Sequence, residues 1–368
     1  MKCYRCDHDS KYKEREGGVC PKCRGTFAFE PQKGDPFTDV GFAKAIEAVS
    51  GHGTVRFDVS HLYYELARRK KGSALQSVLQ ALFVLGGAVA ALSAIAAVTI
   101  AVIGLWHVVP GVLAIGAAAG LASGAAWMAG RARGEGVSSR LSAPTFRASW
   151  ERWQSTHGTP PGLITRSRKG IPMRSAALEE ELRAYSFDRA VICDTPAVVD
   201  VLVANRFHFE NNCAVLSVGG YPESAFETVR AMLRNNPKLL VLTVHDASPE
   251  GCVLAHRLST DPAWFAGQAR VVDVGLRPAH ARFFEGLVQN NDPLEEVVVA
   301  PGITAAEAAW LRKHRLETAA IRPEQLIKRL YKAMLHAEAG GFDATGDTGW
   351  VIFGMDAGTT DGGGDSFG

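Results

Sequence analysis

The longest apolar stretch of the chain carries no polar stripe at helical spacing. Between Gly72 and Gly130 there is no Asp, Glu, Lys or Arg. A helix needs about 20 consecutive apolar residues to cross a bilayer. Two runs, Val78 to Trp106 and Val112 to Met128, approach or exceed that length on either side of a turn near His107. Because a long helix of a soluble protein would show a polar face, the pattern predicts a transmembrane helical hairpin over residues 73–131.

Basic residues flank this stretch on both sides. Arg68-Arg69-Lys70-Lys71 precede the first span, and Arg131, Arg133 and Arg140 follow the second. Lys and Arg are enriched on the cytoplasmic side of membrane helices. We therefore expect the hairpin in the inner, cytoplasmic membrane with both termini in the cytoplasm. The charge-free spans favour an anchor in the lipid bilayer over a transport path.

Gly116, Gly120 and Gly124 recur at four-residue spacing along the second span. Rows of small residues allow helix backbones to approach closely. The row is consistent with two arrangements, packing of the second helix against the first, or homo-oligomerisation through this face.

From Asp188 onward, short continuous apolar runs alternate with amphipathic segments. Strands are predicted at Ala190–Cys193, Ala214–Val218, Leu239–Val244 and Ala269–Val274, and helices at Pro196–Asn205, Glu223–Asn235, Glu250–Leu258 and Pro278–Gln289. Continuous apolar strands separated by helices are typical of a mainly parallel sheet covered on both faces. The pattern predicts a C-terminal α/β domain over residues 188–336 that ends in an amphipathic helix, Glu324–Ala339.

Polar residues follow the predicted strands. Asp194 follows the first, Gly219-Gly220-Tyr221-Pro222 the second, and the segment from His245 to Gly251 the third. Ligands of open α/β sheets gather at the carboxyl ends of the strands, so a site is expected there.

Between the N-terminus and the hairpin, residues 35–72 predict a small winged-helix-like unit. Phe37 to Val49 has apolar residues at helical spacing, Thr54-Val55-Arg56-Phe57 is β-like, and Asp58-Val59-Ser60 caps a second helix, His61 to Lys71.

After the hairpin, residues 132–187 form a connector. Its Phe146, Trp150 and Trp153 share one helical face that either meets the membrane interface or docks on the next domain. Residues 337–368 predict a flexible Gly/Asp-rich tail with an apolar insert, Trp350 to Met355.

Cysteine usage adds a metal site. Cys3-x2-Cys6 and Cys20-x2-Cys23 enclose 13 residues. Two such pairs supply four thiolates to a closed, structural tetrahedral zinc site, which predicts a zinc ribbon over residues 1–34. Ribbons of this type bind nucleic acid or protein, or cap a domain. Cys193, Cys213 and Cys252 lie in apolar segments and are expected to be buried. The net charge of +2 argues against a protein that coats nucleic acid through an overall excess of positive charge.

Two parts of the chain resemble one family. Leu62-Tyr63-Tyr64-Glu65-Leu66 resembles the tyrosine motif of the topoisomerase VI A-subunit family. Asp194, Gly220-Tyr221-Pro222 and Asp246-Ala247-Ser248-Pro249-Glu250-Gly251 resemble the turns of its Toprim domain. The similarity covers about Phe37 to Lys71 and Asp188 to Lys332, and leaves out the zinc ribbon and the hairpin.

The resemblance implies a DNA-cleaving site. Tyr64 would attack a DNA phosphate, Asp194 and Asp246 would hold Mg²⁺, and Glu250 is a substitute ligand. The chain departs from the family pattern, because Ser60 stands where the family carries an arginine, Asp194 replaces a glutamate, and Ser248 replaces the third acid. The hairpin also separates in sequence the two modules that must cooperate.

These departures favour binding over catalysis. The first hypothesis is a membrane-anchored scaffold that binds DNA or protein in a multi-protein system, with defence as one setting. The second is an active Mg²⁺-dependent tyrosine DNA transesterase or nuclease, which in this family works with an ATPase partner. The third is a membrane sensor whose ribbon and α/β domain recognise protein.

Overall fold

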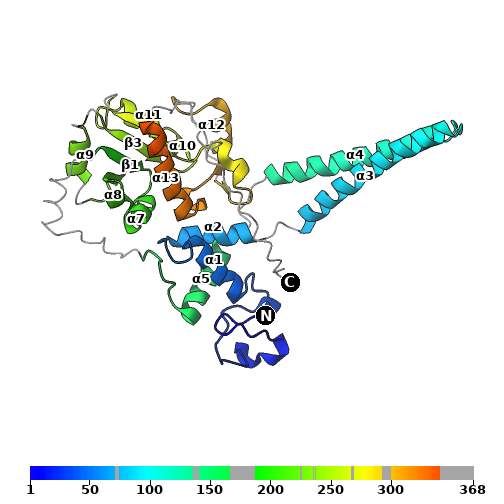
Figure 1. Cartoon of the computed structure of the whole chain (residues 1–368), viewed down its shortest axis with the longest axis horizontal. Helices are drawn as coiled ribbons and strands as arrows, with labels where there is room; N and C mark the ends of the chain where they lie inside the picture. Colours follow the sequence, from blue (N-terminus) through cyan, green and yellow to red (C-terminus); the bar gives the residue numbers. More distant parts are fainter. Residues whose placement is uncertain are drawn as a thin grey trace. The chain divides into compact units, whose positions relative to one another are not determined.

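The computed structural model describes residues 1–70, 74–135, 141–165, 187–223, 226–234, 236, 238–266, 269–291 and 300–339 (Figure 1). The chain divides into two compact units, one formed by residues 1–69 with 141–368 and the other by residues 70–140. Within the predicted connector, residues 166–186 lie outside the described residues, as do the tail from residue 340 and its Trp350–Met355 insert.

The first unit begins with a cysteine-bearing segment of short 3-10 helices, η1 (Tyr12–Glu14), η2 (Glu16–Gly18) and η3 (Pro31–Lys33), followed by helices α1 (Asp39–Val49) and α2 (Val59–Arg69). The side chain of Thr38 caps α1 by accepting a hydrogen bond from the Gly41 N–H. The buried Asp39 carboxylate accepts the N–H groups of Ala28 and Phe29 at 2.9 and 3.0 Å. These bonds tie the cysteine segment to the start of α1.

Helix α5 (Ala143–His157) packs on this region. The ring of Trp153 stacks on Phe42 with centroids 4.7 Å apart, and Nε2 of His157 lies 2.7 Å from the Asp39 carboxylate. Phe146, at the other end of the helix, meets the ring of Tyr63 at 5.3 Å. The aromatic face therefore docks within the protein, but on α1 and α2, so the predicted docking on the following α/β domain is wrong.

A four-stranded parallel sheet forms the C-terminal part of the first unit, as predicted. Its order is β2-β1-β3-β4, with β1 at Arg189–Cys193, β2 at Cys213–Ser217, β3 at Leu240–Val244 and β4 at Arg270–Asp273. Connecting elements are α7 (Pro196–Ala204), α8 (Phe207–Glu210), α9 (Phe226–Arg234), α10 (Pro249–Cys252), α11 (Leu254–Thr260), η4 (Pro278–Phe283), α12 (Ala305–Leu311), η5 (Thr318–Ala320) and α13 (Pro323–Glu338). Two short strands, β5 (Gln289–Asn290) and β6 (His314–Arg315), pair antiparallel.

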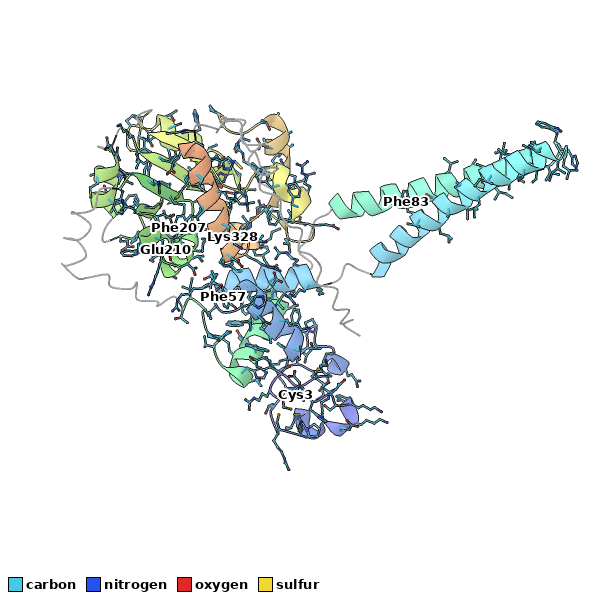
Figure 2. All side chains as sticks on the ribbon, viewed as in Figure 1. Cys3, Phe57, Phe83, Phe207, Glu210 and Lys328 are labelled. Atoms are coloured by element: carbon cyan, nitrogen blue, oxygen red, sulfur yellow. The ribbon has the colours of Figure 1, made fainter. Side chains whose placement is uncertain are left out.

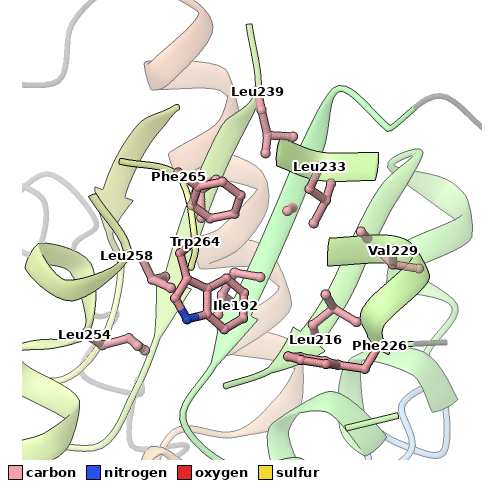
Figure 3. Packing of buried hydrophobic residues seen from close by; sticks show 13 residues of the cluster. Ile192, Leu216, Phe226, Val229, Leu233, Leu239, Leu254, Leu258, Trp264 and Phe265 are labelled. Atoms are coloured by element: carbon pink, nitrogen blue, oxygen red, sulfur yellow. The ribbon is translucent and has the colours of Figure 1, made fainter. Parts of the chain in front are cut away.

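The sheet is buried on both faces. On one face, α9 and α11 pack on alternate strand residues such as Ile192 and Leu216, with Trp264 and Phe265 closing the cluster (Figure 3). Helix α7 contacts β1 and β2, α8 contacts β2, and α13 contacts β3. Because all five residues of both β2 and β3 are buried, the continuous apolar runs of the sequence are explained by helices on both sides.

The winged-helix-like segment is tied to the α/β part. Phe57, labelled in Figure 2, lies near the start of α2. It is fully buried and pairs with Leu163 in a parallel bridge. The side chain of Asn205, at the end of α7, accepts from the N–H of Arg56 and donates to its carbonyl at 2.8 and 2.9 Å. The α1–α2 segment and the α/β part thus belong to one compact unit.

Two predicted helices of the α/β part are wrong in extent. Glu250–Leu258 is broken at Val253 into α10 and α11, because the Cys252 carbonyl accepts a hydrogen bond from Arg277 Nη1 at 2.9 Å. The predicted helix Pro278–Gln289 is a short 3-10 turn that ends at Phe283. The chain then turns through Gly286, at φ 74°, and enters β5.

The second unit contains helices α3 (Ala74–Val102) and α4 (Val109–Glu135). The first ends earlier than predicted, since Gly104 adopts φ 87° and the Leu105 N–H returns to the Ile100 carbonyl. The segment Phe83–Val102 is long and apolar enough to cross a membrane, and only 6% of its apolar stretch is buried within the protein. Val109–Ala125 is a shorter apolar helix.

Candidate functional site

The four N-terminal cysteines converge on one point. Their sulfur atoms all lie within 4.8 Å of one another, with Cys3 and Cys23 separated by 3.6 Å and Cys6 and Cys20 by 3.7 Å. A tetrahedral zinc ion with Zn–S bonds of about 2.3 Å separates its sulfurs by roughly 3.8 Å. The prediction of a four-cysteine metal site is confirmed at the level of its geometry, which fits zinc.

Both cysteine pairs adopt the same turn. The Asp7 N–H donates to the Cys3 carbonyl, and the Arg24 N–H donates to the Cys20 carbonyl, each at 2.9 Å. Asp7 and Arg24 both have positive φ, 54° and 59°. Backbone hydrogen bonds, first that of the Cys23 N–H, lower the pKa of Cys20 to about 6. The second turn thus favours the thiolate form of Cys20, whereas burial raises the pKa of Cys3.

The second candidate site lies where the strand order of the sheet reverses. β1 pairs with β2 on one side and with β3 on the other, so a connection crosses the sheet there and leaves a crevice beyond the strand ends. Asp194 and Asp246 follow β1 and β3. The Asp246 N–H donates to Oδ2 of Asp194 at 2.7 Å. The structure therefore brings these two predicted residues together.

The two carboxylates differ in their surroundings. Oδ1 of Asp194 is buried and has no hydrogen-bond partner among the described residues. Burial, followed by the charge of Asp246, raises the pKa of Asp194 to about 7. Asp246 is satisfied, because its Oδ1 accepts from both the N–H and the hydroxyl of Thr318 at 2.6 and 2.7 Å.

The remaining predicted ligands do not complete a metal site. Ser248 caps α10, its hydroxyl accepting from the Gly251 N–H at 3.0 Å. Glu250 is exposed in the first turn of α10. Within the described part of the chain, the cysteine cluster is the one group of three or more metal-ligating side chains close enough to share an ion. Asp194 and Asp246 remain a pair.

The role of a buried histidine next to the Asp194–Asp246 pair was not predicted. His245 is fully buried, with Nε2 2.8 Å from Asp273 Oδ1 and Nδ1 2.8 Å from the Asp246 carbonyl. Since both ring nitrogens face oxygen acceptors, both carry protons. Burial lowers the pKa of His245, but the Asp273 carboxylate outweighs it and the pKa is raised. The only sequence signal is a histidine directly after a buried strand.

Tyr64 belongs to a closed ring of hydrogen bonds. Its side chain is buried, its hydroxyl donates to Glu317 Oε2 at 2.9 Å, and Gln289 Nε2 donates to the same hydroxyl at 2.6 Å. Arg315 closes the ring by bonding to Gln289 Oε1 at 3.0 Å and pairing with Glu317. Burial and the Glu317 charge raise the pKa of Tyr64 well above its ordinary value.

The surroundings of Tyr64 stabilise the neutral phenol. A phenol that attacks phosphate needs nearby cations and access to the substrate, whereas the nearest charged partner of this hydroxyl is a carboxylate. Yet Tyr64 lies close to the carboxylate pair, because Glu317 directly precedes Thr318, which binds Asp246. The helices α3 and α4 separate Tyr64 from the two acids in sequence, but all three residues lie in one compact unit.

Comparisons of the chain with protein-family profiles, with curated proteins and with solved structures returned no match.

Proposed function

We propose that the chain is a membrane-anchored zinc-ribbon protein whose winged-helix-like and Toprim-like module has lost catalysis and works as a scaffold that binds DNA or protein. The observation that carries the proposal is the position of Tyr64. Its hydroxyl is occupied by Glu317 and Gln289, and its ring is buried. The missing third acid, replaced by the helix cap Ser248, supports the same conclusion.

The anchor in this proposal is a hairpin of two spans with both termini in the cytoplasm. It is supported by the apolar segment Phe83–Val102, the apolar segment Val109–Ala125, and the exposed side chains on both helices. In water such a surface would be costly. Its flanking Arg and Lys residues favour the cytoplasmic orientation. The scaffold would assemble with protein partners, an ATPase among them, at the membrane surface.

Loss of catalysis is tested by trapping covalent protein–DNA adducts. Cells that express the full chain with its native partners are lysed in SDS, and DNA-linked protein is measured for the natural chain and for Tyr64→Phe. The proposal predicts no adduct in either sample. An adduct formed by the natural chain and absent from Tyr64→Phe would show that Tyr64 is a nucleophile.

A second candidate function rests on Asp194. Among the described residues, Oδ1 of Asp194 is buried and has no hydrogen-bond partner, while Oδ2 of the same carboxylate accepts the Asp246 N–H at 2.7 Å. An unpartnered carboxylate oxygen beside a second acid is suited to a divalent cation. When bound, Mg²⁺ would supply Lewis-acid chemistry for a DNA transesterase or nuclease, with Asp194 and Asp246 as its ligands. A ligand that binds the native state raises its stability. Millimolar Mg²⁺ that stabilises the natural chain at pH 8, but not Asp194→Asn, would support this alternative.

A further inference from the structure

The end of α2 carries a charge cluster that the sites above do not use. The Glu65 carboxylate is 1% exposed and accepts hydrogen bonds from three arginines. Arg68 and Arg69 reach it from the same helix at 2.6 and 2.9 Å, and Arg322, which precedes α13, donates through Nε and Nη2 at 2.9 Å each. Arg68 also donates to the Ala320 carbonyl at 2.7 Å.

This cluster has an excess of positive charge at its surface. Three guanidinium groups surround one carboxylate, which leaves two positive charges uncompensated within the cluster. Burial raises the pKa of Glu65, but the Arg322 hydrogen bond and the charges of the arginines hold it below its usual value. Glu65 is therefore ionised and fixes the arginines in place. Each arginine side chain is still about one-third exposed, between 32 and 33%.

Such an arrangement is suited to phosphate. Guanidinium groups bind phosphate oxygens in a bidentate manner, and arginines already held by Glu65 lose little side-chain entropy on binding. The covalent chain also limits the distance between these arginines and the first apolar helix. Only residues 70–73 separate Arg69 from Ala74, the first residue of the apolar helix α3, so the two residues are at most about 18 Å apart.

We propose that Arg68, Arg69 and Arg322, fixed by Glu65, form a binding site for the phosphate headgroup of an anionic phospholipid. The inference rests on the proposed membrane anchor, which brings α2 to the lipid surface. The bound headgroup would hold the end of α2 at the lipid surface. A basic residue near an anionic membrane surface contributes about 1 kcal/mol, which corresponds to about a fivefold change in affinity.

Native mass spectrometry of the full chain in neutral detergent tests the site. Phosphatidylglycerol and phosphatidylcholine are titrated separately, and the affinity ratio is measured for the natural chain and its variants. Arg69→Gln leaves Glu65 its bonds from Arg68 and Arg322, so folding should survive, and the preference for phosphatidylglycerol should fall about fivefold. Arg322→Gln should produce a similar or larger loss.

A matched control is Arg230→Gln, which removes a partly exposed arginine paired with Glu227 on α9. It should leave the lipid preference unchanged. An equal preference in the natural chain, Arg69→Gln and Arg322→Gln would overturn the inference. So would displacement of the lipid by glycerol phosphate or inorganic phosphate at the same concentration, or by duplex DNA, because each would identify a different ligand.

The same preparations separate this inference from the anchor proposal. Membranes that contain the full chain are washed with alkaline carbonate before detergent is added. Protein that stays in the membrane but shows no lipid preference would contradict the headgroup site alone. Protein that is released by carbonate would contradict the anchor, whatever its lipid preference in detergent.

Discussion

The hydroxyl of Tyr64 donates a 2.9 Å hydrogen bond to the carboxylate of Glu317, a residue 253 positions later in the chain. The bond links α2 to the segment that precedes η5, although α3 and α4 lie between them in the sequence. Gln289 and Arg315 complete the ring around it. This network makes Tyr64 a structural tie between α2 and the segment that precedes η5.

Replacement of Tyr64 by Phe should therefore destabilise the protein. The ring would still pack, but Glu317 and Gln289 would each lose a partner in a partly buried position, which costs about 1 kcal/mol or more. Denaturant unfolding of the detergent-solubilised protein measures the loss. Tyr12→Phe serves as the control, since Tyr12 is 37% exposed. Equal stability of Tyr64→Phe and the natural protein would contradict the structural role.

Asp194 should make stability depend on pH. Its pKa is about 7 in the folded protein and 3.8 when unperturbed. Between these values the unfolded state loses the proton while the folded state keeps it, so stability falls as pH rises from about 4 to 7. Asp194→Asn keeps an acceptor for the Asp246 N–H and cannot ionise. We expect equal stabilities near pH 4 and a variant more stable by the order of a few kcal/mol at pH 8.

Unfolding midpoints across this range test the prediction. Asp261→Asn provides the comparison, because Asp261 lies on the partly exposed loop after α11, where its side chain accepts the local Ala263 N–H and pairs weakly with Arg257 at 3.9 Å. A difference between Asp194→Asn and the natural protein that stays constant from pH 4 to pH 8 would show that Asp194 titrates normally in the folded state.

The cysteine cluster should bind one metal ion whose loss disturbs Trp153. Structural zinc contributes to folding directly, and Tyr4, between the first two cysteines, meets the Trp153 ring at 5.6 Å. Chelation should therefore red-shift tryptophan emission, and Trp153→Phe should abolish the shift. Elemental analysis should find one zinc per chain, none in Cys20→Ala and one in Cys252→Ala. Full zinc content in Cys20→Ala would contradict the four-thiolate site.

The glycine row on α4 separates into packed and open positions. A Cβ at Gly116 would lie 1.9 Å from the Ser93 hydroxyl of α3, whereas a Cβ at Gly124 would meet no atom within 4 Å. Gly116→Val should separate the two helices and lower thermal stability in detergent, while Gly124→Val should not. If Gly124→Val instead changed the oligomeric state measured by light scattering, the row would serve association between copies.

Local sequence patterns were sufficient to predict a part of the structure where a single local feature, such as residue spacing, determines it. The cysteine spacing predicted the cluster, and the positions after β1 and β3 predicted that Asp194 and Asp246 meet, because parallel strands end at one edge. Helix α13 was predicted almost to the residue, since Pro323 and a clear apolar face mark its start and extent.

Features that depend on distant partners were not predictable. Glu317, Gln289 and Arg315 carry no local signal and matter only because they surround Tyr64. The pairing of His245 with Asp273 requires knowledge of the strand order β3-β4. The break in the predicted helix Glu250–Leu258 likewise depends on Arg277, which comes from another loop.

The most direct test of the anchored scaffold is the side of the membrane on which the turn between α3 and α4 lies. His107→Cys places a thiol in that turn, and Lys238→Cys places one on the surface of the α/β part. A membrane-impermeant maleimide should modify His107→Cys in intact cells and Lys238→Cys only after lysis. Modification of His107→Cys only after lysis would contradict a hairpin that crosses the bilayer twice with both termini inside.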